Sequence, residues 1–164
     1  MVLLLQRSNR GIKMISNNYI FDNSCYPYGY PSIENINSID NSDEIFVFGS
    51  NLRGRHGKGA ALQALNMYGA KEGVGIGPSG NTYAIPTKDS NLRVLFLKDI
   101  ASHVNEFIEY AKMNYNYQFL VTKIGCGLAG YKESDIAPLF KNCKGIFNIH
   151  LPETFVRYLK NNNI

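Results

Sequence analysis

The sequence predicts one three-layer α/β domain, in which a mostly parallel central sheet is covered by helices on both faces. Short runs of β-branched and aromatic residues alternate along the chain with stretches of helical periodicity, which is typical of this class. Two of the predicted strand-to-helix connections are rich in glycine. The length of 164 residues fits a single domain with one substantial interior.

The first half of the domain begins with the clearest predicted strand, Glu44–Phe48, a buried-type run that ends at Gly49. Good helix formers then predict a helix at Ala60–Tyr68. A second short strand is expected at Thr82–Pro86. From Lys98 to Met113, apolar residues recur at i, i+4, i+7, i+8 and i+11, which predicts an amphipathic helix.

The second half repeats the alternation. The run Phe119–Ile124 predicts a buried strand, and Glu133–Phe140 predicts a helix that Pro138 shortens or kinks. A last strand is expected at Ile146–Leu151, followed by a short helix at Phe155–Leu159. Residues 41–164 therefore carry the α/β fold.

The first 40 residues differ in composition from the rest. They are rich in Asn, Ser and Tyr and are interrupted by Pro27 and Pro31. Apart from a possible strand at Val2–Leu5, this segment predicts an irregular N-terminal arm that forms part of the same domain.

Composition narrows the classes of function. The fractions of hydrophobic (45%) and charged (18%) residues are those of a globular protein. The five apolar residues at the start are too few to cross a membrane, and no signal-peptide cleavage site follows, so we expect a cytoplasmic protein, in the host-cell cytoplasm if the chain is viral. Three cysteines without a CxxC pair predict neither a disulfide framework nor a metal site. The net charge of +4 favours phosphate-bearing ligands but falls short of a nucleic-acid binder.

The first glycine-rich loop, Gly49–Ala61, joins a predicted strand to a predicted helix. Unpaired amides and the positive end of the dipole at a helix start attract anions. Glycines allow close approach to phosphate, and Arg53, Arg55 and Lys58 add positive charge. The loop matches neither the Walker pattern nor the dinucleotide fingerprint, so ATP hydrolysis and NAD-dependent redox chemistry lose support and no cofactor is predicted.

The second glycine-rich loop, Ile124–Tyr131, also lies between a predicted strand and a predicted helix, and it contains Gly125, Gly127 and Gly130. Two such loops at strand ends provide two sets of amides that can hold a diphosphate between them. Cys126 lies near a helix start, but no histidine adjoins it in the sequence. We therefore predict a small loop residue there rather than a nucleophile.

The two glycine-rich loops and the segments around them resemble those of a known family. The segments VFGSNLRGRHGKGAALQAL (residues 47–65) and VTKIGCGLAGY (residues 121–131) resemble the two phosphate loops of macrodomains, which bind ADP-ribose. The run TYAIPTKD (residues 82–89), a long helix and IGCGL together are most similar to the subclass that removes terminal ADP-ribose from acidic side chains. The similarity spans residues 44–151, about two-thirds of the chain.

The resemblance implies roles for individual residues. Asn51 stands where macrodomains often have an asparagine near the distal ribose, and Lys88 stands where the subclass has a lysine that can react with the ribose C1″. Tyr131 either closes over the ligand or packs on the domain. The full implied ligand-binding set is Ser50, Asn51, Gly57, Lys58, Gly59, Ala60, Gly125, Cys126, Gly127, Leu128, Ala129, Gly130 and Tyr131.

One departure from the subclass concerns catalysis. A catalytic aspartate is expected just after GCGL, and this chain has Ala129 there. The remaining catalytic candidates are Lys88, Asn51 and His56, and Asp89, Asp135 or His56 can stand in for the missing carboxylate. His56 is expected to be exposed, either as a general base or as a loop residue that contacts solvent or phosphate. Lys123 is expected to pair with a carboxylate or with the ligand.

Three functions remain open at this stage. The first is removal of ADP-ribose from a modified macromolecule. The second is hydrolysis of ADP-ribose 1″-phosphate. The third is non-catalytic reading of ADP-ribose or a related signalling nucleotide. The expected partner in each case is ADP-ribose or an ADP-ribosylated macromolecule, with nucleic acid disfavoured except as the modified substrate.

Overall fold

The computed structural model describes residues 43–164 throughout, and before them only the backbone of four two-residue strands. These are β1 (Arg7–Ser8), β2 (Gly11–Ile12), β3 (Tyr19–Ile20) and β4 (Ser32–Ile33). The possible strand at Val2–Leu5 lies outside the described residues, as does most of the predicted arm, residues 1–40. That division of the chain therefore stays a prediction.

The central sheet is mostly parallel, as predicted. Its strand order is β3-β4-β9-β8-β5-β7-β6, and every neighbouring pair from β4 to β7 is parallel, whereas β3–β4 and β6–β7 are antiparallel. Its other strands are β5 (Glu44–Asn51), β6 (Gly77–Ser79), β7 (Thr82–Lys88), β8 (Gln118–Val121) and β9 (Ile149–Pro152).

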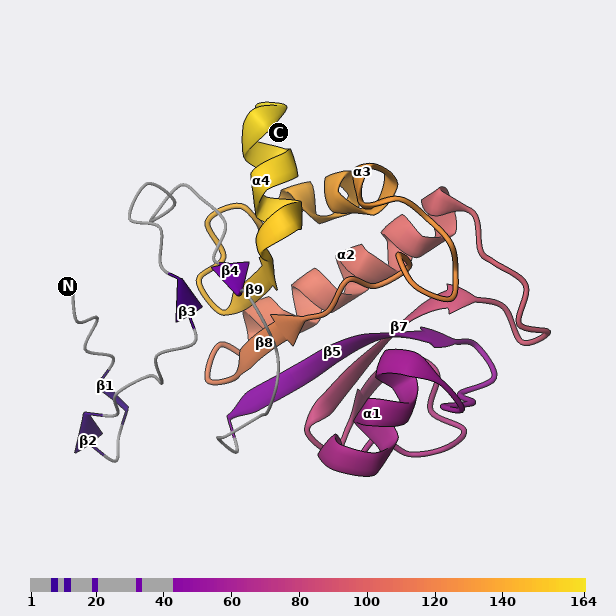
Figure 1. Ribbon diagram of the computed structural model, residues 1–164. Coiled ribbons are helices and arrows are strands. Elements are labelled where there is room, and N and C mark those ends of the chain that lie inside the picture. The colour runs from indigo at the N-terminus through magenta and orange to yellow at the C-terminus, as the bar shows by residue number, and fades with distance from the viewer. Residues whose placement is uncertain (1–6, 9–10, 13–18, 21–31, 34–42) are drawn as a thin grey trace.

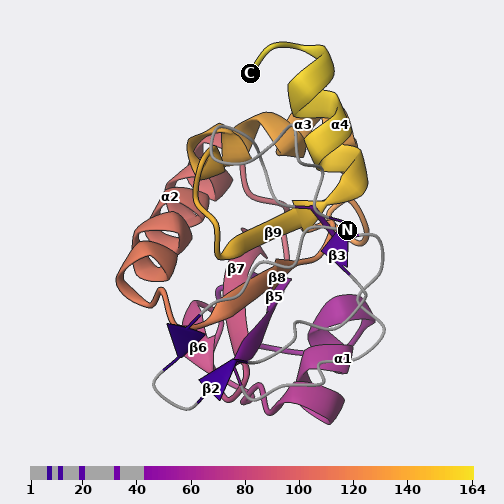
Figure 2. The same cartoon turned by 90° about the vertical axis from the view of Figure 1, so that its left-hand side faces the viewer.

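Helices cover both faces of this sheet, which confirms the predicted layers. Helix α1 (Gly59–Tyr68) lies on one face, and α2, α3 and α4 lie on the other (Figure 1; Figure 2). Their bounds are Leu97–Met113, Glu133–Ile136 and Glu153–Asn161. No helix in the described part of the chain is both long and apolar enough to cross a membrane.

Strand β5 contributes to two hydrophobic cores, because alternate side chains of a strand point to opposite faces. Ile45 and Val47 pack with α2, α3 and α4, whereas Phe46 and Phe48 pack with α1. The predicted apolar stripe of α2 is fully buried in the larger core, at Ile100, Val104, Phe107, Ile108 and Ala111.

Several predicted boundaries are wrong, each for a local reason. Strand β8 ends at Val121 because the chain turns tightly, with the Ile124 amide donating to the Thr122 carbonyl. The predicted helix Glu133–Phe140 divides into α3 and a 3₁₀ segment, Ala137–Cys143, since proline near its start has no N–H to donate.

The arrangement of connections fixes where a ligand can bind. Strand β5 lies between β8 and β7. Its chain continues into α1 on one face, whereas β7 continues into α2 on the other face. Ligands in open α/β sheets bind at such a switch point, outside the carboxyl ends of the strands. Those ends lie toward the right of Figure 1.

Candidate functional site

A cavity of about 570 Å³ lies at the carboxyl ends of β5, β7 and β8, at the switch point. Both glycine-rich loops line it, although about 70 residues separate them in the sequence. The lining residues are Gly49, Ser50, Asn51, Arg55, Gly57, Lys58, Gly59, Ala60, Ala61, Thr87, Lys88, Leu92, Lys123, Ile124, Gly125, Gly127, Leu128 and Ala129.

The first loop is held by polar side chains at its start. The Asn51 side chain donates from Nδ2 to the Arg55 carbonyl (2.7 Å) and accepts at Oδ1 from the Arg55 amide (3.1 Å). The Ser50 hydroxyl donates to the carbonyl of Gly75. Asn51 therefore lines the cavity, as the resemblance implies, but both polar atoms of its side chain already have partners within the loop.

Glycines in this loop allow one backbone to lie directly on another. Gly54 has φ +71°, and a Cβ there would lie 2.3 Å from the carbonyl carbon of Gly73. The Gly73 amide donates to the Gly54 carbonyl (2.9 Å). The first loop thus rests on a second irregular segment, and no side chain fits between them.

The start of α1 offers free amides to the cavity. Lys58 is the N-cap residue and makes no side-chain cap. The amides of Gly59, Ala60 and Ala61 belong to the first turn, which has no helical acceptor, and no acceptor for them occurs among the described residues. This end of α1 therefore suits an anion.

The second loop is held by backbone bonds and by the core. The Tyr131 amide donates to the Gly125 carbonyl, and the Gly130 amide donates to the Gly127 carbonyl, both at 3.0 Å. Gly125 has φ +72°, and a Cβ there would lie 2.8 Å from Cδ1 of the buried Ile136 on α3.

The second loop also has free amides along the cavity wall. Within the described part of the chain, no acceptor is found for the amides of Gly125, Gly127, Leu128 and Ala129. The two loops approach each other in two places, since a Cβ on Gly59 would lie 3.7 Å from Leu128 Cδ1 and a Cβ on Gly49 would lie 3.5 Å from the Gly125 nitrogen. The cavity therefore brings together two separate groups of unpaired backbone donors.

A bulge in β7 brings two consecutive residues to the cavity. Ser50 pairs with Pro86 and Asn51 with Lys88, so Thr87 is an extra residue in the register. Consecutive residues of a regular strand point to opposite faces, but Thr87 and Lys88 both line the cavity. The Thr87 hydroxyl donates to the Ser50 carbonyl at 3.3 Å and joins the two strand ends.

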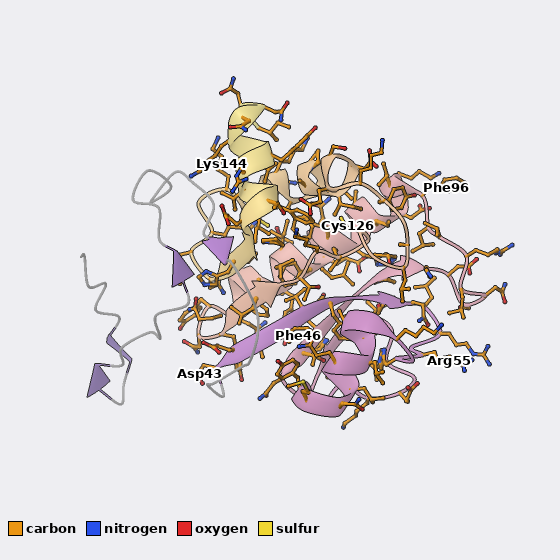
Figure 3. The ribbon with its side chains drawn as sticks, in the orientation of Figure 1. Asp43, Phe46, Arg55, Phe96, Cys126 and Lys144 are labelled. Carbon is orange, nitrogen blue, oxygen red and sulfur yellow. The ribbon has the colours of Figure 1, made fainter. Side chains whose placement is uncertain are left out.

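Positive charge dominates the lining. Arg55, Lys58, Lys88 and Lys123 line the cavity, and no Asp or Glu is among its described lining residues. As predicted, Lys123 pairs with a carboxylate, because its Nζ lies 2.7 Å from Oε1 of Glu133. The other three cations form no ion pair with a described residue. Arg55 lies in the loop after β5, on the right-hand side of the molecule in Figure 3, where Phe96 also lies.

His56 is not exposed, so that expectation is wrong. Its side chain is fully buried, with the ring edge-on to Phe48 at 5.3 Å and Nε2 at 3.0 Å from the Lys71 carbonyl. It lies on the side of the first loop away from the cavity, where the His56 backbone amide donates to Oε1 of Glu72 (3.2 Å). The ring is thus part of the loop's support and is not placed as a general base.

Three residues of the implied ligand-binding set do not line the cavity: Cys126, Gly130 and Tyr131. The Tyr131 hydroxyl donates to the Leu95 carbonyl (2.6 Å) and its ring packs on the larger core, so this side chain packs on the domain. Burial raises the pKa of the Cys126 thiol to about 11, which keeps it protonated and agrees with the prediction that it is no nucleophile. Cys126 also packs on the larger core.

Sequence reasoning did not place Thr87 and Leu92 at the site. Thr87 adjoins Lys88, but only the register with β5 shows that both reach the cavity. Leu92 lies in the connection from β7 to α2, and no residue pattern marks it. Within the described residues, no group of three His, Cys, Asp or Glu side chains is placed to hold a metal ion.

Comparison with known proteins adds evidence for the fold. No protein-family model matches the chain, and no curated protein matches it. A solved structure, described as that of a protein of unknown function from Bacteroides thetaiotaomicron, superposes with a TM-score of 0.53 at 15% identity. The match covers 76% of this chain and 94% of that chain. At this identity the likeness supports the α/β fold alone.

Proposed function

We propose that this chain is a macrodomain-type protein whose cavity binds ADP-ribose, free or attached to a macromolecule. One observation carries the proposal. Two sets of unpaired backbone N–H groups, one at the start of α1 and one in the Gly125–Ala129 segment, lie on the wall of one cavity. A diphosphate has two charged groups in series, so it matches two groups of donors. The surrounding cations and the absence of a lining carboxylate among the described residues favour the same ligand.

Calorimetry with ADP-ribose tests this proposal directly. We expect saturable binding that inorganic pyrophosphate displaces, with an affinity that falls as salt rises. AMP carries a single phosphate, so it serves as the matched weak ligand. Heat of binding that stays absent at millimolar ADP-ribose would rule the proposal out.

Hydrolysis of an ADP-ribose linkage is a second candidate, and Lys88 favours it. The bulge brings Lys88 to the cavity, where its amine has no ion pair with a described residue. In the subclass that the sequence resembles, such a lysine reacts at the ribose C1″. The lack of a lining carboxylate, with Ala129 at the expected position, favours a reader instead.

Incubation with mono-ADP-ribosylated protein separates these alternatives. Release of ADP-ribose by the native chain that is lost in Lys88→Ala supports hydrolysis by that lysine. Binding without release supports the reader. ADP-ribose 1″-phosphate serves as a parallel substrate, in which liberated inorganic phosphate reports the phosphatase activity.

A further inference from the structure

Leu92 combines two unusual properties at the edge of the cavity. Its backbone has φ +65°, a conformation that is rare for residues other than Gly, Asn and Asp. Its side chain is 42% exposed, so packing in the protein interior does not compensate for that conformation. The side chain lines the cavity. A strained, exposed leucine at a binding cavity is a candidate for function.

The turn that contains Leu92 is firmly built. Beyond β7 the chain folds back on itself, since Lys88 pairs with Val94 in an antiparallel bridge and the Leu95 amide donates to the Thr87 carbonyl. The Asp89 amide donates to the Arg93 carbonyl (2.8 Å), and the Leu92 amide donates to the Asp89 carbonyl (3.1 Å). These bonds fix a short hairpin with Leu92 near its tip.

One carboxylate fastens the tip. Asp89 accepts from the amides of Asn91 (2.8 Å) and Arg93 (2.9 Å) and from Nε of Arg93 (2.8 Å). The hydrogen bonds from Arg93, its backbone amide first, outweigh desolvation and lower the pKa of Asp89 below its ordinary value. In three-residue hairpin loops the left-handed position normally holds glycine, and Leu92 stands at this position here. The turn therefore carries an apolar side chain at a position where the backbone conformation favours glycine, which has no side chain.

The position of Leu92 identifies the part of the ligand that it meets. It lies in the connection that follows Lys88, the last residue of β7, whereas the free amides belong to the loops after β5 and β8. ADP-ribose has an uncharged group at each end of its diphosphate, the adenosine and the distal sugar. The resemblance puts the ribose C1″ beside Lys88, so under the proposed function the distal sugar is the group at the β7 side of the cavity. Leu128, also exposed, is the other leucine on the cavity wall and comes from the second loop.

We propose that Leu92 is a specificity-determining residue whose side chain packs on the uncharged sugar beyond the diphosphate. The ring carbons of a sugar present an apolar face, and covering Leu92 with that face removes exposed apolar surface from both partners. The hairpin holds the leucine in place before the ligand arrives, so little order is lost on binding. This inference rests on the proposed function, and it identifies the distal sugar as the part of the ligand that the β7 side of the cavity contacts.

The test compares ADP-ribose with ADP, which lacks the distal sugar, on native protein and on Leu92→Gly. Glycine adopts the left-handed conformation without strain, so the hairpin stays intact and the melting temperature stays the same or rises by a few degrees. We expect the affinity for ADP-ribose to fall about tenfold and the affinity for ADP to change less than twofold.

Two further variants control the interpretation. Leu92→Met keeps an apolar side chain, and we expect it to retain most of the preference for ADP-ribose over ADP. Phe96→Ala removes a 73% exposed side chain of the same connection that does not line the cavity, and we expect no change for either ligand.

Each contrary result has a distinct meaning. Equal losses for ADP and ADP-ribose in Leu92→Gly, unchanged affinity for ADP-ribose, or a lowered melting temperature each overturn the role of Leu92 while leaving the proposed function in place. Native protein that binds neither ligand overturns the proposed function and the role of Leu92 together.

Discussion

The two glycine-rich loops line the same cavity, but they are supported in different ways. The first loop rests on another irregular segment through backbone contacts at Gly54 and through the side chains of Ser50 and Asn51. The second loop rests on a buried side chain of α3 and on its own backbone bonds. The first also carries charge within the loop, at Arg55 and Lys58, whereas the second has none of its own from Gly125 to Gly130.

This difference indicates how the two loops divide the work of binding. The first supplies both donors and charge, and its shape depends on contacts with a segment that belongs to no helix or strand. The second supplies donors whose positions follow from the packing of the core. We therefore expect substitutions in the first loop to change the free energy of unfolding and the ligand affinity together. For substitutions in the second loop, we expect the loss of stability to depend on how far the side chains of α3 can adjust.

The largest effect is expected for Gly54→Ala. A Cβ there meets backbone atoms of Gly73 and Val74 at 2.3–2.5 Å, and backbone cannot move aside as a side chain can. Together with the positive φ, this predicts a loss of about 3–5 kcal/mol in the free energy of unfolding and loss of ADP-ribose binding. Urea unfolding and calorimetry measure the two quantities.

Gly125→Ala is expected to cost less, about 2–3 kcal/mol, because the obstacle is the terminal carbon of Ile136, which can rotate. The matched control is Gly127→Ala in the same loop, where a Cβ meets nothing within 4 Å, and we expect a change below about 0.5 kcal/mol. If Gly125→Ala proves more damaging than Gly54→Ala, the contrast between the two supports is wrong.

Asn51→Ala removes both bonds that join this side chain to the Arg55 backbone. We expect a loss of roughly 1–3 kcal/mol in the free energy of unfolding, together with weaker ADP-ribose binding because Arg55 and its loop are released. Thermal unfolding and calorimetry are measured on the same samples. Weaker binding at unchanged stability instead supports direct contact between Asn51 and the ribose, as the family resemblance implies.

A smaller effect is expected for Glu133→Gln, which breaks the ion pair with Lys123, the cation that directly precedes the second loop. Burial raises the pKa of Glu133, but the hydrogen bond and the charge of Lys123 outweigh it, so the pKa is lowered overall. The stabilisation is therefore present above the ordinary pKa of glutamate and is lost as pH falls through the lowered value.

For this half-exposed pair we expect the variant to lose less than about 1 kcal/mol at pH 7, and the difference from native protein to vanish in acid. Affinity for ADP-ribose is expected to rise slightly, because the charge of Lys123 is no longer neutralised. Chemical unfolding across pH 3–8 provides the measurement. A difference that grows toward acid contradicts the predicted sign.

The smallest effect concerns Cys126. Its pKa of about 11 leaves little thiolate at pH 7, so iodoacetamide should label it slowly, with a rate that rises about tenfold for each pH unit up to that value. Peptide mass mapping distinguishes this residue from the others. We expect Cys126→Ala to leave ADP-ribose binding unchanged within twofold, and rapid labelling at neutral pH contradicts the raised pKa.

Much of the fold follows from local patterns in the sequence. The stripe of α2 has the helical period, and the run Ile45–Phe48 within β5 is uniformly apolar because both faces of this strand are buried. Strand β6, with the sequence Gly-Pro-Ser, was not predicted, since it has no β-branched or aromatic residue and forms through pairing with β7. The glycine loops were recognised because their composition is unusual and because each follows a strand.

The rest of the site depends on contacts between segments far apart in the chain. The burial of His56 depends on Lys71 and Glu72, and no feature of the first loop's own sequence reveals it. The bulge at Thr87 is a property of the register between β5 and β7. The conformation of Leu92 arises from a hairpin in which glycine is the usual choice, so residue preferences predict the opposite.

Because Thr87 is an extra residue in β7, this strand presents a hydroxyl and an amine to one cavity from consecutive positions. Lys88 lies opposite Asn51, and the Thr87 hydroxyl ties the bulge to the Ser50 carbonyl. Deleting Thr87 therefore removes this tie and one residue of the cavity wall, while Lys88 keeps Asn51 as its strand partner. A single added residue thus enlarges the polar wall of the cavity without changing which residues of β5 and β7 face each other at its floor.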